Sequence, residues 1–246
     1  MIKRGNKKGQ VTIFIIIAVL VVAIVAIFFI FRGKAGNESS SSEASPIYTK
    51  TISCLETTTQ EGAKYIALKG GYYEIPEELS LVYFTDEVPY YYINSQKTMP
   101  SLRRVERELE KYITANLDSC VGFEGFEEQG FEIKKGDLTV NVGIKGKNIH
   151  VYANYPLSIK KGEDTSLLGE FHLDIASNIE EVYYACEDIL NSYSLKPGFV
   201  CLTCLEDTSD KYDVIARATP LQGRNAIWFS VSDNEEELEW RFVVEE

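Results

Sequence analysis

The sequence has few of the residues on which enzymes and metal sites most often depend. It contains only two histidines among 246 residues. It also lacks an H-E-x-x-H zinc motif, a G-x-S-x-G nucleophile elbow and a glycine-rich phosphate loop. His150 alternates with Tyr152 on the polar face of an expected strand. His172 alternates with Asp174 on another, and both patterns favour histidines that face solvent. We therefore expect a protein that is not an enzyme and that holds no metal or cofactor.

Acidic residues are absent from the first 34 positions, although they dominate the rest of the chain. The N-terminal stretch holds six basic residues. The remaining 212 residues hold 19 basic and all 37 acidic ones, which gives a net charge of −18. Phosphate backbones and anionic lipid headgroups repel such a domain. The composition therefore excludes nucleic acid as an expected partner.

Charged residues are also absent from Val11 to Phe31, a run of 21 residues in which Thr12 is the only polar side chain. A helix of this length spans about 31 Å, close to the thickness of the hydrocarbon core of a bilayer. The basic segment Lys3–Lys8 before it favours an N-terminus inside the cell and a C-terminal part outside. We expect a single transmembrane helix over 10–32, which anchors the chain in the cell membrane through residues 11–31.

The residues Lys7-Lys8-Gly9-Gln10 stand immediately before this apolar run. Together with the span, they resemble the N-terminus of archaeal type IV pilin-like proteins, which carry a class III signal peptide. The resemblance implies a basic cytoplasmic leader over 1–9, which a prepilin peptidase removes by cutting between Gly9 and Gln10. A plain uncleaved signal anchor is the alternative. Many pilins have glutamate at the fifth mature position, where this chain has Phe14, and this difference favours an anchored surface protein over a filament subunit.

A small and polar segment, GKAGNESSSSEAS, follows the span at 33–45. Its composition cannot bury a hydrophobic core and is typical of a flexible tether, which we place at 33–46. Asn37-Glu38-Ser39 matches the N-x-S/T sequon, so Asn37 is a candidate glycosylation site. The remaining residues, 47–246, then form an acidic extracellular domain.

The apolar pattern along 47–246 predicts an α+β fold. Helical spacing runs from Ile47 to Ile66, from Leu102 to Leu117 and from Ile179 to Tyr193. Strand-like alternation predicts one hairpin at 138–144 and 149–155, ended by Pro156, and a second strand pair at 157–159 and 171–175. Further strands are expected at 81–85 and 90–94, with a final meander at 212–219, 226–232 and 238–244. We expect about three helices with antiparallel hairpins between them.

The helix at Leu102–Leu117 has one apolar stripe, and seven charged residues lie on its other faces. They are Arg103, Arg104, Glu106, Arg107, Glu108, Glu110 and Lys111. A charged face of this kind is typical of a solvated surface, and we expect it to be exposed.

Five cysteines in an exported domain favour disulfide bonds. Cys54 and Cys120 each lie beside the apolar face of a predicted helix, so they either form a disulfide that joins the two helices or remain two buried thiols. Cys201-Leu202-Thr203-Cys204 is a C-x-x-C motif. We interpret it first as part of a structural disulfide, either within the pair or to Cys186, with a redox-active pair or half of a zinc site as alternatives. Cys186 lies on the core face of its predicted helix, which favours a buried thiol.

Three consecutive tyrosines, Tyr90-Tyr91-Tyr92, form a candidate binding surface in a chain with 15 tyrosines. Exposed tyrosines provide stacking area for sugars or for a partner protein. Neighbouring residues of a strand point to opposite faces, so at least one of the three is expected in the core.

Together these features predict a single-pass, membrane-anchored cell-surface protein with a pilin-like leader. We expect it to present its acidic domain for binding to a surface protein, a glycan or a solute, without enzymatic activity. Two alternatives remain open. One is an exported thiol–disulfide oxidoreductase that uses Cys201 and Cys204, and the other is a subunit of a type IV pilus-like filament.

Overall fold

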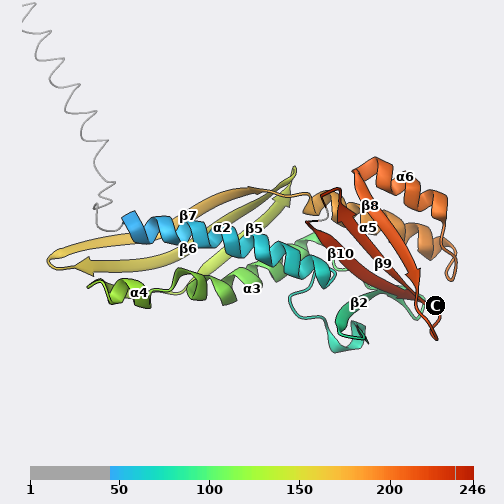
Figure 1. The fold of residues 1–246 in the computed structure, drawn as a ribbon, viewed down its shortest axis with the longest axis horizontal. Coiled ribbons are helices and arrows are strands. Elements are labelled where there is room, and N and C mark those ends of the chain that lie inside the picture. Colours follow the sequence, from blue (N-terminus) through green and yellow to red (C-terminus); the bar gives the residue numbers. More distant parts are fainter. Residues whose placement is uncertain (1–44, 236) are drawn as a thin grey trace, which may run out of the picture. The chain divides into compact units, whose positions relative to one another are not determined.

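The computed structural model describes residues 45–235 and 237–246 (Figure 1). The chain divides into two compact units, Met1–Ser42 and Glu43–Glu246. All the described residues belong to the second unit, which we call the C-terminal domain. Within these residues, no helix combines the length and the apolar character needed to cross a membrane. The predicted leader, span and most of the tether lie outside the described residues, and so do Gly9, Gln10 and Asn37.

The C-terminal domain has the predicted α+β fold and contains two sheets (Figure 1). The six-stranded sheet has the order β1 (Ser80–Tyr83), β2 (Asp86–Ile93), β10 (Glu239–Glu245), β9 (Ala226–Asp233) and β8 (Val214–Pro220), with β3 (Gln96–Lys97) paired to β2. The four-stranded sheet consists of β4 (Glu132–Lys135), β5 (Thr139–Lys145), β6 (Asn148–Lys161) and β7 (Asp164–Ala176). Its pairs are antiparallel, as predicted. In the six-stranded sheet, however, β2 and β10 are parallel, which the sequence did not indicate.

Three of the helices correspond to the predicted ones: α2 (Ser45–Leu68), α3 (Leu102–Val121) and α5 (Ile179–Leu195). Helices α2 and α3 lie side by side along the four-stranded sheet, whereas α5 packs on the six-stranded sheet (Figure 1). The short α4 (Glu124–Glu127), the 3-10 helix η1 (Glu77–Leu79) and α6 (Leu202–Tyr212) were not predicted. The sequence shows no apolar stripe for α6, because the one buried residue along this helix is Thr208.

Strand β6 does not end at Pro156, so the predicted break there is wrong. Its pairs with β5 end at Asn154, and its pairs with β4 begin at Leu157. Pro156 therefore lies between two ladders, where its missing N–H costs no sheet hydrogen bond. Its carbonyl accepts a hydrogen bond from the backbone N–H of Gly136 at 2.7 Å. The proline is accommodated at a gap between partner strands, and one long strand replaces the two short ones that we expected.

Within the described part of the chain, helices cover only one face of the four-stranded sheet. Odd-numbered residues of β6 are buried, from Ile149 to Ile159, whereas the even-numbered residues between them are exposed or half-buried. Helices α2 and α3 cover the odd-numbered face. The ring of Tyr48 on α2 stacks on Phe171 of β7, with centroids 5.4 Å apart, and the Tyr155 hydroxyl donates a hydrogen bond to Asp118 of α3. We call the uncovered, even-numbered face the open face.

The charged side of α3 is only partly a solvated surface, so our expectation for it needs correction. Glu106 and Glu110 accept hydrogen bonds from the backbone N–H groups of Ile144 and Val142, both at 3.0 Å. These N–H groups belong to β5, and among the residues that the structure describes no other strand pairs with its outer edge. An uncovered edge invites pairing with another chain, and the two carboxylates occupy that edge.

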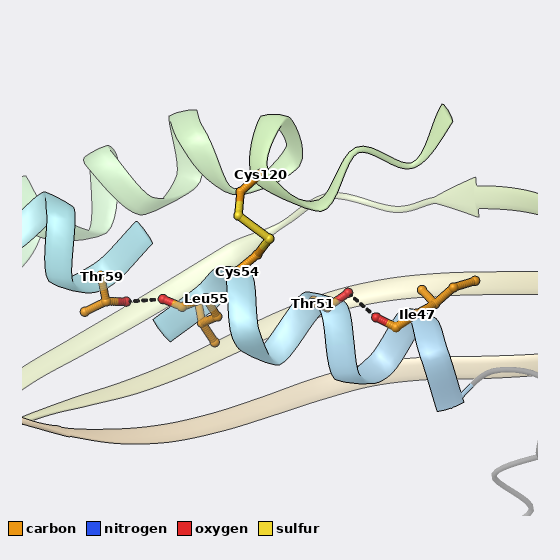
Figure 2. The surroundings of a disulfide bond; sticks show 6 residues. All are labelled: Ile47, Thr51, Cys54, Leu55, Thr59 and Cys120. Atoms are coloured by element: carbon orange, nitrogen blue, oxygen red, sulfur yellow. Dashed lines mark hydrogen bonds between the residues drawn. A yellow bond between two sulfur atoms is a disulfide. The ribbon is translucent and has the colours of Figure 1, made fainter. Parts of the chain in front are cut away.

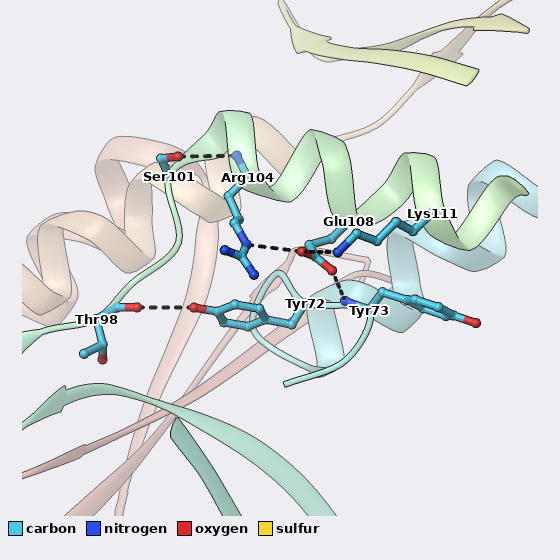
Figure 3. Close-up of polar contacts among 7 residues, drawn as sticks. All are labelled: Tyr72, Tyr73, Thr98, Ser101, Arg104, Glu108 and Lys111. Carbon is cyan, nitrogen blue, oxygen red and sulfur yellow. Dashed lines mark hydrogen bonds and ion pairs between the residues drawn. The ribbon is translucent and has the colours of Figure 1, made fainter. Parts of the chain in front are cut away.

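Glu108 is a buried charge, with 2% of its surface exposed. Its carboxylate accepts hydrogen bonds from Arg104 Nε at 3.2 Å, from Lys111 Nζ at 2.9 Å and from the backbone N–H of Tyr73 at 3.2 Å (Figure 3). The contact with Tyr73 ties the segment after α2 to α3. A buried carboxylate is tolerated here because three donors replace the water that it has lost.

Glu108→Ala should lower the free energy of unfolding by about 2 kcal/mol, as measured by urea denaturation. The change leaves the Tyr73 N–H without its acceptor, whereas the half-exposed Arg104 and Lys111 return to water. Glu108→Gln keeps an acceptor for Tyr73 and should lose about half as much. Arg103→Ala, at an exposed position of α3, is the control and should change stability by less than about 0.5 kcal/mol. Equal stability of the Glu108→Ala and Arg103→Ala variants would contradict this role.

Candidate functional site

The three consecutive tyrosines do not form an exposed surface. Tyr90, Tyr91 and Tyr92 are all buried, with at most 7% of their surface exposed. Strand β2 lies between β1 and β10, and side chains cover both of its faces. The predicted binding surface is therefore corrected to a part of the core.

Tyr91 has a structural role that explains its burial. Its hydroxyl donates a hydrogen bond to the Gly70 carbonyl at 2.8 Å and accepts one from Trp240 Nε1 at 2.7 Å. Its ring stacks on Phe242, with centroids 4.5 Å apart. Burial raises the pKa of the Tyr91 hydroxyl well above its ordinary value, so the proton that it donates stays in place. The tyrosine thus joins the end of α2 to strand β10.

The disulfide between Cys54 and Cys120 joins α2 to α3 (Figure 2). The alternative of two buried thiols is thereby excluded. The bond closes a loop of 66 residues, and on the chain-entropy model it stabilises the fold by about 4 kcal/mol. Two threonines on α2 bond within their own helix, Thr51 to the Ile47 carbonyl and Thr59 to the Leu55 carbonyl. The Cys54–Cys120 disulfide, which we call the staple, connects two helices that also pack together in the core.

A second disulfide joins Cys201 to Cys204. With a sequence separation of only 3, it contributes about 2 kcal/mol on the same model. Cys186 is buried on α5 without a disulfide partner, and burial raises the pKa of its thiol well above the ordinary value. No group of three or more histidine, cysteine or acidic side chains is placed to hold a metal ion among the described residues.

The open face brings both histidines of the chain together. His150 of β6 pairs with Asp174 of β7, and their side chains contact each other with His150 Nδ1 2.7 Å from Asp174 Oδ1. One pair further along, Tyr152 faces His172, and their rings lie 4.6 Å apart at an angle of 57°. These four side chains form the candidate site, which we call the histidine ladder.

Strand β5 leaves room beside the histidine ladder. Gly143 is the register partner of His150 on that side, and a side chain added to it would meet no atom within 4 Å. Asn141 is the partner of Tyr152 and offers an amide at the same level. Together with the ladder, these residues line a shallow, open hollow of about 340 Å³. About half of the His150 side chain and 72% of the Asp174 side chain are exposed, so the pair contributes little to stability and is available to a ligand.

A bulge in β6 sets the register of the histidine ladder. At the turn, Lys161 pairs with Asp164, and this register alone would place His150 opposite Ile175. The register shifts by one between Asn154 and Leu157, where two residues of β6 face Gly169 of β7. His150 therefore meets Asp174 instead. The sequence pattern predicts a polar strand face for each histidine, but it does not reveal the bulge that brings the two histidines together.

No protein-family model, curated protein or solved structure matches the chain.

Tyr91→Phe should lower the free energy of unfolding by about 2–3 kcal/mol, because the Gly70 carbonyl and the Trp240 indole N–H both lose their buried partner. Denaturant titration followed by tryptophan fluorescence measures the change. The matched control is Tyr48→Phe, at a tyrosine that is 43% exposed, where we expect a change below about 0.5 kcal/mol. A Tyr91→Phe variant as stable as the control would show that the tyrosine hydroxyl has no structural role.

Proposed function

We propose that the chain is a membrane-anchored cell-surface protein that binds a glycan through the histidine ladder, without enzymatic activity at that site. The observation that carries the proposal is the open face of the four-stranded sheet. One face of this sheet is packed against α2 and α3, whereas the other presents polar and aromatic side chains to solvent. A sheet with one open, polar face needs no partner for stability, so aromatic rings gathered there are available for recognition.

The chemistry of the open face suits a sugar ring. Tyr152 and His172 provide a pair of aromatic rings for stacking. Asn141, His150 and Asp174 surround them with hydrogen-bond donors and acceptors for hydroxyl groups. The hollow is open and shallow, which suits a chain of sugars lying across the sheet better than a small substrate that must be enclosed.

The location of the protein rests on the two disulfides together with the sequence of the N-terminus. Disulfides persist in oxidising compartments outside the cytosol, and four of the five cysteines are paired. In our proposal, residues 11–31 anchor the chain in the bilayer, a prepilin peptidase cleaves between Gly9 and Gln10, and Asn37 carries a glycan. Helix α2 begins at Ser45 and therefore includes the last two residues of the tether that we placed at 33–46.

On intact cells, an amine reagent that cannot cross membranes should label exposed lysines of the C-terminal domain, such as Lys50 and Lys160. Mass spectrometry of the labelled peptides identifies the sites. Labelling that occurs only after lysis would contradict a location on the cell surface. In the same sample, the membrane-extracted protein should begin at Gln10. An intact Met1 would remove the cleaved leader but not the anchor.

Tyr152→Ala and His172→Ala should each weaken binding to immobilised cell-envelope polysaccharide by about tenfold or more, as expected when a stacking ring is lost. Surface plasmon resonance with the detergent-solubilised protein measures the affinity. Tyr184→Ala, at an exposed tyrosine on α5, is the matched control and should bind as the wild type does. Unchanged binding of both ladder variants would exclude the open face, and absence of binding by the wild type would exclude a glycan.

A further inference from the structure

The Cys201–Cys204 disulfide lies at the N-terminus of a helix. Cys201 is the N-cap residue of α6, an 11-residue helix, and its sulfur accepts a hydrogen bond from the backbone N–H of Cys204 at 3.2 Å. The unpaired N–H groups at a helix N-terminus stabilise negative charge. A thiolate on Cys201 would therefore be stabilised after the disulfide is reduced, as in reactive C-x-x-C pairs. The acidic Glu206 and Asp207 follow Cys204 at exposed positions of α6, where solvent screens their charge.

The disulfide is accessible, and apolar side chains surround it. Both sulfur-bearing residues are partly exposed, and Leu202 between them is 73% exposed. Phe199, just before the motif, is 55% exposed. Phe199 lines a narrow cleft beside the two cysteines, together with Tyr193 and Val200. Exposed apolar side chains next to a disulfide offer a docking surface to a protein segment that carries thiols.

Helix α6 has other contacts that hold it when the disulfide is open. Lys211 and Tyr212, at its C-terminal end, both bond to Asp188 of α5, at 2.7 and 3.0 Å. Thr208 is buried, and the helix packs on α5 and β8. The disulfide itself closes a loop too short to constrain the unfolded chain strongly. Reduction therefore changes the chemistry of the site without dismantling the domain.

We propose that Cys201–Cys204 is an exchange-active disulfide, which accepts two electrons from a dithiol on an exported protein. A thiolate of the partner attacks the Cys201 sulfur and forms a mixed disulfide, while Cys204 leaves as a thiolate and takes up a proton. The partner's second thiolate then attacks the partner's first sulfur, which is bonded to Cys201 in the mixed disulfide. This step releases Cys201 as a thiolate, where the helix N-terminus stabilises the leaving group. The partner gains a disulfide, and the two protons from its thiols end on Cys201 and Cys204.

The Cys54–Cys120 disulfide provides an internal control in the same molecule. The full-length protein, solubilised in detergent, is equilibrated with mixtures of reduced and oxidised dithiothreitol, and alkylation with peptide mapping quantifies each disulfide. We expect half-reduction of Cys201–Cys204 at a ratio of reduced to oxidised reagent about 100-fold lower than for Cys54–Cys120, whose Cys54 is almost fully buried. Reduction of both disulfides at the same ratio, or of Cys54–Cys120 first, would overturn the proposal.

Two single variants test which sulfur reacts. Cys204→Ser leaves the Cys201 thiol, which should react with iodoacetamide half-maximally at a pH about one unit below that of an ordinary cysteine. Cys201→Ser keeps a capping oxygen on α6 and leaves Cys204, which should react at an ordinary pH or more slowly. An ordinary pH midpoint for Cys201 would overturn its assignment as the attacked sulfur. If either variant fails to fold, the redox titration of the wild-type protein decides alone. Neither result depends on glycan binding.

Discussion

The packing of α2 and α3 against one face of the four-stranded sheet is the interaction on which the rest of the C-terminal domain depends. It buries the odd-numbered residues of β6 and leaves the even-numbered ones in solvent. The Cys54–Cys120 bond joins the two helices, and Glu108 ties the segment after α2 to α3. Because the helices pack on one face, the solvent-facing residues of the opposite face do not fill the core between helices and sheet, and the proposed binding site lies there.

The two proposed activities occupy different parts of the domain. The histidine ladder belongs to the four-stranded sheet, whereas the Cys201–Cys204 pair belongs to α6, which packs on α5 and β8 of the six-stranded sheet. They also make different demands on the fold. The ladder requires a register that one bulge determines, and the cysteine pair requires only the start of a helix. A substitution can therefore abolish one activity and leave the other intact.

Local patterns in the sequence predicted much of this fold but not the contacts between distant segments. The hairpin at 138–155 and the three long helices were predicted because alternation and helical spacing are properties of neighbouring residues. The parallel pairing of β2 with β10 joins segments about 150 residues apart, and no local pattern encodes it. Tyr90–Tyr92 were predicted as a binding surface because a pattern of consecutive aromatic residues does not reveal that β2 is an interior strand. The candidate site was found only in parts, since the bulge that aligns His150 with Asp174 has no signature in the sequence.

The staple between α2 and α3 also determines how the domain would carry mechanical load. If the chain is held at its N-terminal side and a ligand pulls on the four-stranded sheet, the tension enters at the start of α2. Unwinding can proceed along that helix only as far as Cys54, where the force passes through the disulfide to Cys120. Residues 55–119 lie inside the closed loop and cannot be extended while the bond is intact. Under such a load, the covalent link would thus shield the part of α2 after Cys54, β1 to β3 and most of α3.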